Sequence, residues 1–195
     1  MEWGLALLLG YALGSIPFGL ILTRMTGAGD LRAIGSGNIG ATNVLRTGRK
    51  GLAAATLLLD MGKGLAAVLL AWRFFPGAVE LAAFGAFVGH CFPIWLRFKG
   101  GKGVATMMGI SLGIAWPIGL AYAAAWLGLL ALTRVSSLAG MTAAVIAPIA
   151  ALATGHERFV PVLGGLAVLV LYLHRANIAR LMAGTEPKVG GGKKA

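Results

Sequence analysis

Six long apolar runs, separated by short polar segments, dominate the sequence. They cover Trp3–Thr23, Leu52–Trp72, Ala78–Leu96, Val104–Leu132, Leu138–Thr154 and Phe159–Leu173. A helix that crosses a bilayer needs about 20 apolar residues, so this pattern predicts an all-α, polytopic membrane protein. The fourth run is long for one helix and contains Trp116-Pro117, where proline removes a backbone donor and can end a helix. We therefore expect it to divide there, which raises the expected number of spans to seven, two of them short.

The composition supports this interpretation. Hydrophobic residues make up 58% of the chain and charged residues only 12%, against roughly 45–50% and about 25% in soluble domains. A mean hydropathy of +0.84 over 195 residues leaves no room for a separate soluble domain. We expect residues 1–195 to form one integral membrane domain embedded in a lipid bilayer. The single cysteine, Cys91, excludes an internal disulfide.

The charge distribution predicts how the chain is oriented. The net charge is +11, but a nucleic-acid groove needs a solvated scaffold, which this composition does not supply, so no nucleic acid is expected. Thirteen of the 17 Lys and Arg residues fall in the segments 24–50, 97–103 and 175–194. The positive-inside rule puts all three segments in the cytoplasm, which requires an odd number of spans. Seven transmembrane helices, with the N-terminus outside and the C-terminus cytoplasmic, satisfy this rule.

The first basic segment carries a dense set of glycines and small polar residues. They are Gly35, Ser36, Gly37, Asn38, Gly40, Thr42 and Asn43, and Arg46 follows. The G-x-G-x-x-G match is weak because no strand precedes it. Glycines nevertheless let backbone N–H groups approach an anion, while the polar side chains can bind its oxygens. The alternative is an ordinary solvated loop, since such residues are common in turns.

The second basic segment leads directly into an apolar run. Gly100, Gly101 and Gly103 surround Lys102, and backbone donors, a helix dipole and an ammonium group together suit a phosphate. The P-loop pattern is absent, so nucleotide hydrolysis is not implied. Lys99 and Lys102 could instead anchor a span at the interface. His90 is equally consistent with a packed helix contact.

Other polar residues lie at the end of the last run and inside the second. His174 and Asn177 are three residues apart and would share a helix face at the cytoplasmic rim. Asp60 and Lys63 have the same spacing inside an apolar run, where charges are costly and usually paired. We favour a structural ion pair for them over contact with a substrate.

The motifs GSGNIGATN, GHCFPIWLRFKGGKGVAT and HRANIARL closely resemble those of the bacterial acyl-phosphate:glycerol-3-phosphate acyltransferases, over most of the chain from Gly14 to Glu186. The resemblance implies an inner-membrane enzyme of phospholipid synthesis with seven spans and an active site on the cytoplasmic side. Its implied substrates are acyl phosphate and glycerol 3-phosphate, and its product is lysophosphatidic acid acylated at position 1. It implies neither a cofactor nor a metal ion.

The same resemblance implies roles for particular residues. Catalytic roles carry over to Ser36, Arg46, Lys102, His174 and Asn177. A second group of residues is expected to bind the substrates. It consists of Gly35, Gly37, Asn38, Gly40, Thr42 and Asn43 in the first motif, Gly100, Gly101 and Gly103 in the second, and more weakly Ser137. A structural role carries over to Glu186.

The residues also indicate how the chemistry proceeds. The H-x-x-x-x-D pattern of acyl-CoA-using glycerolipid acyltransferases is absent, and no Cys-His or Ser-His-Asp set is evident. We therefore expect the glycerol hydroxyl to attack directly, without a covalent acyl-enzyme. A transporter of a phosphorylated solute is the main alternative from another class, but it should carry polar residues along several spans. A noncatalytic assembly factor explains the hydrophobicity but not the three polar motifs.

Overall fold

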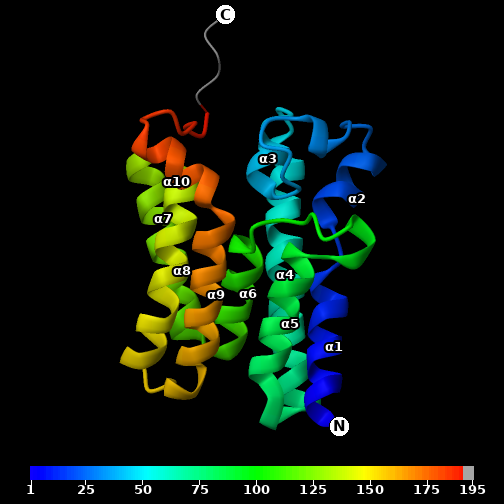
Figure 1. Ribbon diagram of the computed structural model, residues 1–195, viewed down its shortest axis with the longest axis vertical. Coiled ribbons are helices and arrows are strands. Elements are labelled where there is room, and N and C mark those ends of the chain that lie inside the picture. The colour runs from blue at the N-terminus through cyan, green and yellow to red at the C-terminus, as the bar shows by residue number, and fades with distance from the viewer. Residues whose placement is uncertain (191–195) are drawn as a thin grey trace, which may run out of the picture. The chain divides into compact units, whose positions relative to one another are not determined.

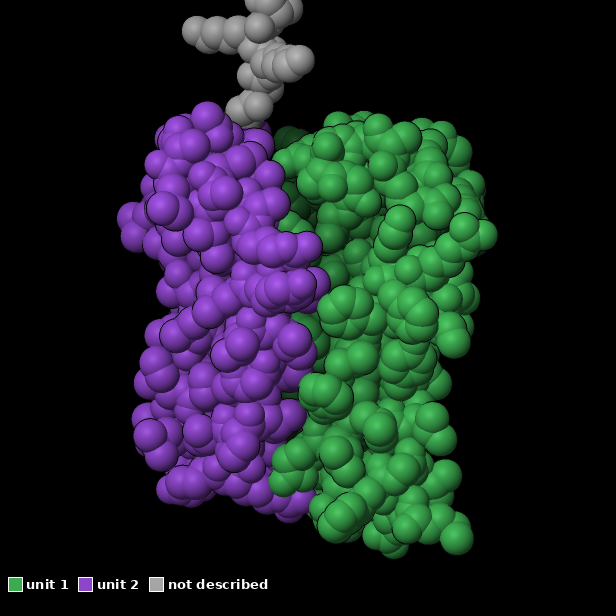
Figure 2. All heavy atoms as spheres, in the orientation of Figure 1, with its two compact units in different colours: residues 1–116 green, residues 117–195 purple. Residues whose placement is uncertain are grey.

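The computed structural model describes residues 1–190 and is all-helical over that part of the chain (Figure 1). The chain divides into two compact units, which Figure 2 colours separately. Unit 1 is Met1–Trp116, and unit 2 begins at Pro117. Each unit is a bundle of helices with its own polar loops. The expectation of a single domain stays a prediction.

Unit 1 contains six α-helices and three short 3₁₀ helices. In chain order they are α1 (Glu2–Gly14), α2 (Phe18–Met25), η1 (Leu31–Ala33), α3 (Ala41–Leu45), α4 (Lys50–Phe74), η2 (Pro76–Ala78), α5 (Val79–Cys91), η3 (Ile94–Leu96) and α6 (Val104–Ile114). The first apolar run is interrupted at Pro17, which precedes α2. The fourth run divides at Ala115, whose backbone is extended, between α6 and α7. The predicted division of this run is therefore confirmed.

Small residues allow close helix packing in unit 1. A Cβ on Gly10 or Gly14 of α1 would collide with the backbone of Ala82 or Ala86 in α5. Gly64 of α4 lies just as close to the backbone of Thr106 in α6. Helices in membranes lack a hydrophobic driving force toward one another, so close approach through small residues is what holds them together.

Unit 2 contains α7 (Trp116–Thr133, whose first residue closes unit 1), α8 (Ser136–Ala153), η4 (Glu157–Phe159), α9 (Val160–Leu173) and α10 (Arg175–Met182). The segment Glu157–Leu173 meets α10 at an angle of 60°. Arg134 forms the corner between α7 and α8 with a positive φ of 61°. Its carbonyl accepts a hydrogen bond from the backbone N–H of Val189 at 2.7 Å, and its guanidinium donates to the carbonyl of the same residue. These contacts attach the segment after α10 to the α7–α8 corner.

Five helical segments in the described residues are long and apolar enough to cross a membrane, and the bent segment 157–182 makes six. The five are Glu2–Met25, Lys50–Phe74, Pro76–Leu96, Trp116–Thr133 and Ser136–Ala153. The predicted seventh span would be α6, which has 11 residues. At 1.5 Å per residue it extends only about 16 Å, short of a hydrocarbon core of about 30 Å. Length and composition therefore support five or six spans.

Candidate functional site

Asn43 organises the loop between α2 and α4. Its side-chain Nδ2 lies 2.8–3.0 Å from the carbonyl oxygens of Leu31, Ile34 and Asn38. Its Oδ1 accepts hydrogen bonds from the backbone N–H of Ser36 at 3.3 Å and from Nη1 of Arg46 at 3.4 Å. The side chain is buried. Asn43 was expected to bind an anion, but its amide is occupied by the loop itself.

One oxygen of Asn43 thus holds both the Ser36 backbone and the Arg46 guanidinium. Both of these residues are exposed. Gly35 has a positive φ of 56°, and a Cβ there would collide with Arg46. Glycine at this position therefore serves the turn and leaves room for the arginine.

The expected backbone donors of this loop are largely used within it. The N–H of Gly37 donates to the carbonyl of Ile34 at 3.0 Å, and that of Gly40 to Oδ1 of Asn38 at 2.8 Å. In this structure the N–H groups of these two glycines are therefore occupied within the loop, and their expected contact with an anion stays a prediction. The side chains of Ser36 and Arg46 are among the exposed donors that the loop presents.

Apolar packing supports the loop from below. Leu20, Leu31, Ile39, Val44 and Ala53 form one buried cluster that joins α2, η1, α3 and α4. The backbone of Ile39 lies against Gly19, where a side chain would not fit. This cluster gives an exposed polar loop a fixed base.

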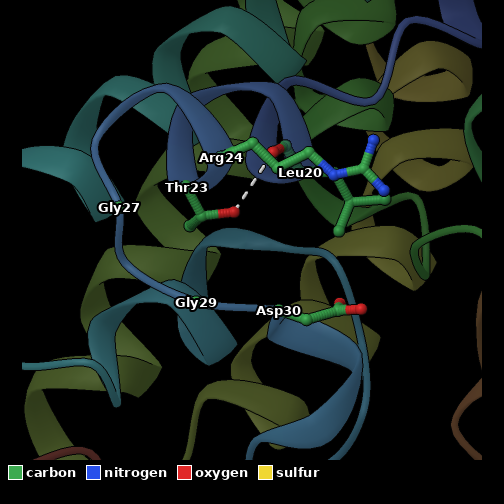
Figure 3. A pocket seen from close by; sticks show the side chains of 6 residues that line it. All are labelled: Leu20, Thr23, Arg24, Gly27, Gly29 and Asp30. Atoms are coloured by element: carbon green, nitrogen blue, oxygen red, sulfur yellow. Dashed lines mark hydrogen bonds between the residues drawn. The ribbon is translucent and has the colours of Figure 1, made fainter.

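A hollow of about 310 Å³ opens beside the same loop. Figure 3 shows Thr23 and Arg24 on one side of it and Gly29 and Asp30 on the other. Asp30 forms an ion pair with Arg32 at 2.7 Å. The side chain and the backbone N–H of Arg32 donate hydrogen bonds to the Asp30 carboxylate, and these bonds lower the pKa of Asp30 to about 2. The hollow therefore has a positive and a negative group at its edge.

The loop before α6 is seated on the end of α5. The N–H of Gly100 donates to the carbonyl of Cys91, and that of Gly101 to the carbonyl of His90, both at 3.0 Å. Side chains at Gly101 and Gly103 would collide with the rings of His90 and Phe87. Both N–H groups are thus occupied in this structure, and a phosphate site at Gly100 and Gly101 stays a prediction. These glycines fix the position of Lys102, which is half-buried.

Two aromatic side chains that the sequence did not single out hold this loop to α1. The hydroxyl of Tyr11 donates to the carbonyl of Phe92 and accepts from the N–H of Ile94, both at 2.9 Å. The indole N–H of Trp95 donates to the carbonyl of Ser15 at 2.9 Å. Trp95 is near the end of an apolar run, as is ordinary for an interfacial anchor, and Tyr11 is inside one, so the sequence carries no signal for this role.

Asp60 and Lys63 form the expected ion pair inside unit 1. Nζ of Lys63 lies 2.7 Å from Oδ1 of Asp60, and both side chains are almost fully buried. The same ammonium donates to the carbonyl of Ile16 at 2.7 Å, at the break between α1 and α2. Nδ1 of His90 lies 3.7 Å from the Asp60 carboxylate, beyond hydrogen-bonding distance.

Glu186 is the centre of the polar cluster in unit 2. Its Oε1 accepts hydrogen bonds from Ser137 Oγ and Asn177 Nδ2, each at 2.6 Å, and its Oε2 accepts from Arg180 Nε at 2.7 Å. Burial alone would raise the pKa of this carboxyl, but the three donors together lower it below its ordinary value. The hydroxyl of Ser137, a residue expected at a substrate, therefore donates a hydrogen bond to Glu186.

His174 lies at the bend between α9 and α10 and is buried. Its Nδ1 is 2.8 Å from the carbonyl oxygen of Val170. A carbonyl oxygen only accepts, so Nδ1 carries the proton, and Nε2 is the basic nitrogen of the neutral ring. On its Nδ1 side the ring is oriented by this backbone carbonyl.

Among residues 1–190, no group of three or more His, Cys, Asp and Glu side chains could hold a metal ion. The polar groups described above form two sets. Ser36, Asn43, Arg46 and Lys102 belong to unit 1, whereas Ser137, His174, Asn177 and Glu186 belong to unit 2.

The sequence profile of the glycerol-3-phosphate acyltransferase family matches residues 4–184. A glycerol-3-phosphate acyltransferase of Novosphingobium aromaticivorans is 74% identical, covering 99% of this chain and 98% of its own. Another, from Erythrobacter litoralis, is 63% identical, covering 97% and 96%. The chain belongs to the glycerol-3-phosphate acyltransferase family.

Two solved structures of acyltransferases are similar to this chain along nearly its whole length. The crystal structure of PlsY (YgiH), an integral membrane glycerol 3-phosphate acyltransferase, in its glycerol 3-phosphate form has a TM-score of 0.92 at 34% identity, covering 97% of this chain and 96% of that one. Its lysophosphatidic acid form has a TM-score of 0.89 at 32% identity, covering 96% and 95%. The acyltransferase described here is an all-helical integral membrane protein.

Proposed function

We propose that this acyltransferase moves a fatty acyl group from acyl phosphate to the 1-hydroxyl of sn-glycerol 3-phosphate, giving lysophosphatidic acid and inorganic phosphate. The observation that carries the proposal is the shared contact of Ser36 and Arg46 with Oδ1 of Asn43. It puts a hydroxyl-bearing residue beside a guanidinium, and a guanidinium is suited to a phosphate oxygen pair. The glycerol 3-phosphate and lysophosphatidic acid forms of PlsY support the choice of acceptor and product.

In this proposal the acyl group passes directly between the two substrates. The hydroxyl oxygen of glycerol 3-phosphate bonds to the acyl carbonyl carbon, the bond from that carbon to the phosphate oxygen breaks, and the hydroxyl proton leaves with the phosphate. Cys91, the chain's one thiol, is buried, which argues against a thioester intermediate. Phosphate is a good leaving group, so no enzymic acid is needed.

The residues are assigned by the chemistry they offer. Ser36 and Arg46 hold the phosphate of the donor, with the exposed residues Gly35 and Thr42 beside them. Lys102 supplies a cation for the phosphate of glycerol 3-phosphate. His174 and Asn177 orient the glycerol moiety or stabilise developing charge on the carbonyl oxygen. Glu186 and Ser137 keep Asn177 in place.

We assign the proton to the departing phosphate and not to His174. The acyl phosphate brings anionic oxygens next to the reacting carbonyl, and a phosphate monoester titrates near pH ~6. Nδ1 of His174 donates to the carbonyl of Val170, so a backbone carbonyl occupies the nitrogen that faces the aspartate in a hydrolase triad. His174 is consequently important but replaceable.

We further propose seven spans in a bacterial inner membrane, with the N-terminus outside and the active site cytoplasmic. This number counts the short helix α6 as one of the seven spans. Segments 24–50 and 97–103 and the C-terminal tail carry most of the basic residues, as cytoplasmic segments do. Of these, Lys193 and Lys194 lie outside the described residues.

A donor comparison on the purified protein tests the reaction. Lysophosphatidic acid formation is measured with acyl phosphate, acyl-CoA and acyl carrier protein as donors, beside an Arg46→Ala variant that reports any co-purifying activity. We expect product from acyl phosphate alone, and little from Arg46→Ala. Equal rates with acyl-CoA, or an Arg46→Ala rate equal to wild type, would overturn the proposal.

A further inference from the structure

Three buried polar side chains of unit 1 have no part in the proposed reaction. Asp60 and Lys63 are one turn apart in α4, and His90 is in the last turn of α5. All three are less than 6% exposed. Charges at such depth are costly and usually serve a function.

The ion pair is connected to the backbone break between α1 and α2. Lys63 joins the Asp60 carboxylate to the carbonyl of Ile16, both at 2.7 Å. Ile16 lies where α1 ends and α2 has not yet begun, and its carbonyl also accepts the backbone N–H of Phe18 at 3.1 Å. The ammonium thus fixes the position of this break relative to α4.

The cluster also reaches the loop before α6 through His90. The Asp60 carboxylate lies 3.7 Å from Nδ1 of the ring. On the other side of the ring, Nε2 lies against Gly101, where a Cβ would not fit, and the His90 carbonyl accepts the N–H of Gly101 at 3.0 Å. Gly101 is therefore held by His90 through both its ring and its backbone.

Lys102 directly follows this held residue. Gly103, next in the chain, has a positive φ of 81° and is packed against Phe87, and α6 begins at Val104. The backbone on both sides of Lys102 is thus constrained by side chains of α5. The direction in which the lysine leaves the loop depends on the position of His90.

We infer that Asp60, Lys63 and His90 are positioning residues for Lys102, which they hold in place for the phosphate of glycerol 3-phosphate. The inference rests on the proposed role of Lys102. The three residues touch neither substrate. Their loss displaces the cation, and a small displacement of a binding group weakens one substrate's contact without altering the other's.

The test removes the ion pair as a unit. In Asp60→Asn/Lys63→Met both charges disappear while the side-chain sizes are nearly kept, which avoids leaving one buried charge unpaired. We expect this variant to melt near the wild-type temperature. We expect its KM for glycerol 3-phosphate to rise about tenfold, with kcat and the KM for acyl phosphate within about twofold of wild type.

Matched variants separate positioning from general damage. Thr56→Val changes another buried polar residue of α4, whose hydroxyl donates only to its own helix at Leu52, and should leave both KM values unchanged. His90→Gln removes the ring from Gly101 and should raise the same KM. It carries the test if the double variant is not recovered in folded form.

Combining the double variant with Lys102→Ala shows whether the network acts through Lys102. If the network acts through Lys102, removing the pair in a Lys102→Ala background causes no further rise in KM. A multiplicative rise in that background, or an unchanged KM in the folded double variant or in His90→Gln, overturns the inference. An unchanged KM in Lys102→Ala alone instead overturns the proposed role of Lys102, and the two failures are thereby distinguished.

Discussion

Asn177 donates a hydrogen bond from its side-chain amide to Oε1 of Glu186 over 2.6 Å. The two residues are on opposite sides of the end of α10, so this contact folds the following segment back onto the helix. Ser137 of α8 donates to the same oxygen, also at 2.6 Å. Glu186 therefore connects a proposed catalytic residue to a second helix.

Glu186→Gln should loosen the segment after α10. The amide keeps one acceptor but turns an N–H group toward donors, and loss of charge-assisted hydrogen bonds of this kind costs about 1–3 kcal/mol. We expect faster trypsin cleavage after Lys188 and reduced kcat, because the hydrogen bond from Asn177 to residue 186 is weakened. Glu157→Gln is the matched control, since Glu157 is exposed in another turn. Equal cleavage rates in the two variants would contradict the connection.

The same cluster should respond to acid. The three donors lower the pKa of Glu186 in the folded protein, so its contribution to stability is fully present above the unfolded pKa of about 4.3. That contribution is lost as the pH falls through the lowered folded pKa. A spin label on Lys188→Cys should accordingly become more mobile below pH ~4 and stay unchanged between pH ~5 and 7. In a Glu186→Gln background this transition should be absent.

Asn43→Ala should disorder the loop that carries Ser36 and Arg46. It removes the amide that lies against three carbonyl oxygens, and buried groups left without partners cost about 1–3 kcal/mol each. We expect kcat/KM to fall at least as far as in Arg46→Ala while the protein stays folded by melting temperature. Thr26→Ala, which removes an exposed hydroxyl of the same loop, should have no effect. Activity near wild type in Asn43→Ala would contradict the organising role.

Lys102→Ala should impair use of glycerol 3-phosphate far more than Lys99→Ala. Lys99 is exposed in the same loop, whereas Lys102 is half-buried and held from both sides. Lys194, a control that the sequence alone suggests, lies outside the described residues. Loss of a charge-assisted contact costs ~1.5–3 kcal/mol, or roughly 10–150-fold in KM. Equal effects in the two variants would favour a role for both lysines as interfacial anchors.

The proposed topology puts the loop before α6 and the C-terminal tail in the cytoplasm. Reporter fusions after Lys188 and at Lys99 should give cytoplasmic signals, because Lys and Arg are retained on that side. A fusion in the turn at Gly155, between α8 and α9, should give the opposite signal. A periplasmic signal at Lys188 or Lys99 would refute the seven-span arrangement.

Periodicity and charge predicted the helices and the division near Trp116-Pro117, because span length and proline chemistry are local properties. The ion pair of Asp60 and Lys63 was predictable for the same reason, since their spacing is one helical turn. The hydrogen-bond partners of the glycine N–H groups were not predictable. Whether the N–H of Gly100 or Gly101 is available depends on the carbonyls of Cys91 and His90, which the loop reaches only after the chain has folded.

Asn43 illustrates the same limit for side chains. Its amide can bind a phosphate or a loop backbone equally well, and in the structure it is buried against three carbonyl oxygens of the loop. Tyr11 and Trp95 gave no signal, because their partners are backbone groups at least 80 residues away. The family could therefore be identified by motif, whereas the contacts of Asn43, Tyr11 and Trp95 required the structure.

The identity of the proton acceptor decides how His174 contributes. Nδ1 of this ring donates to the Val170 carbonyl, so Nε2 could take a proton, but Nδ1 faces a neutral carbonyl in place of the carboxylate that stabilises the imidazolium of a hydrolase triad. If the departing phosphate takes the proton, the ring's task is to donate or accept a hydrogen bond, and glutamine can do part of this. We therefore expect His174→Gln to retain measurable turnover, with a pH dependence of kcat/KM largely like that of wild type. His174→Ala, which removes the hydrogen bond as well, should be slower than His174→Gln. A general base would behave differently: the rate of His174→Gln would fall by about 10⁴, the acidic limb of the profile would disappear, and the substrate-assisted scheme would have to be abandoned.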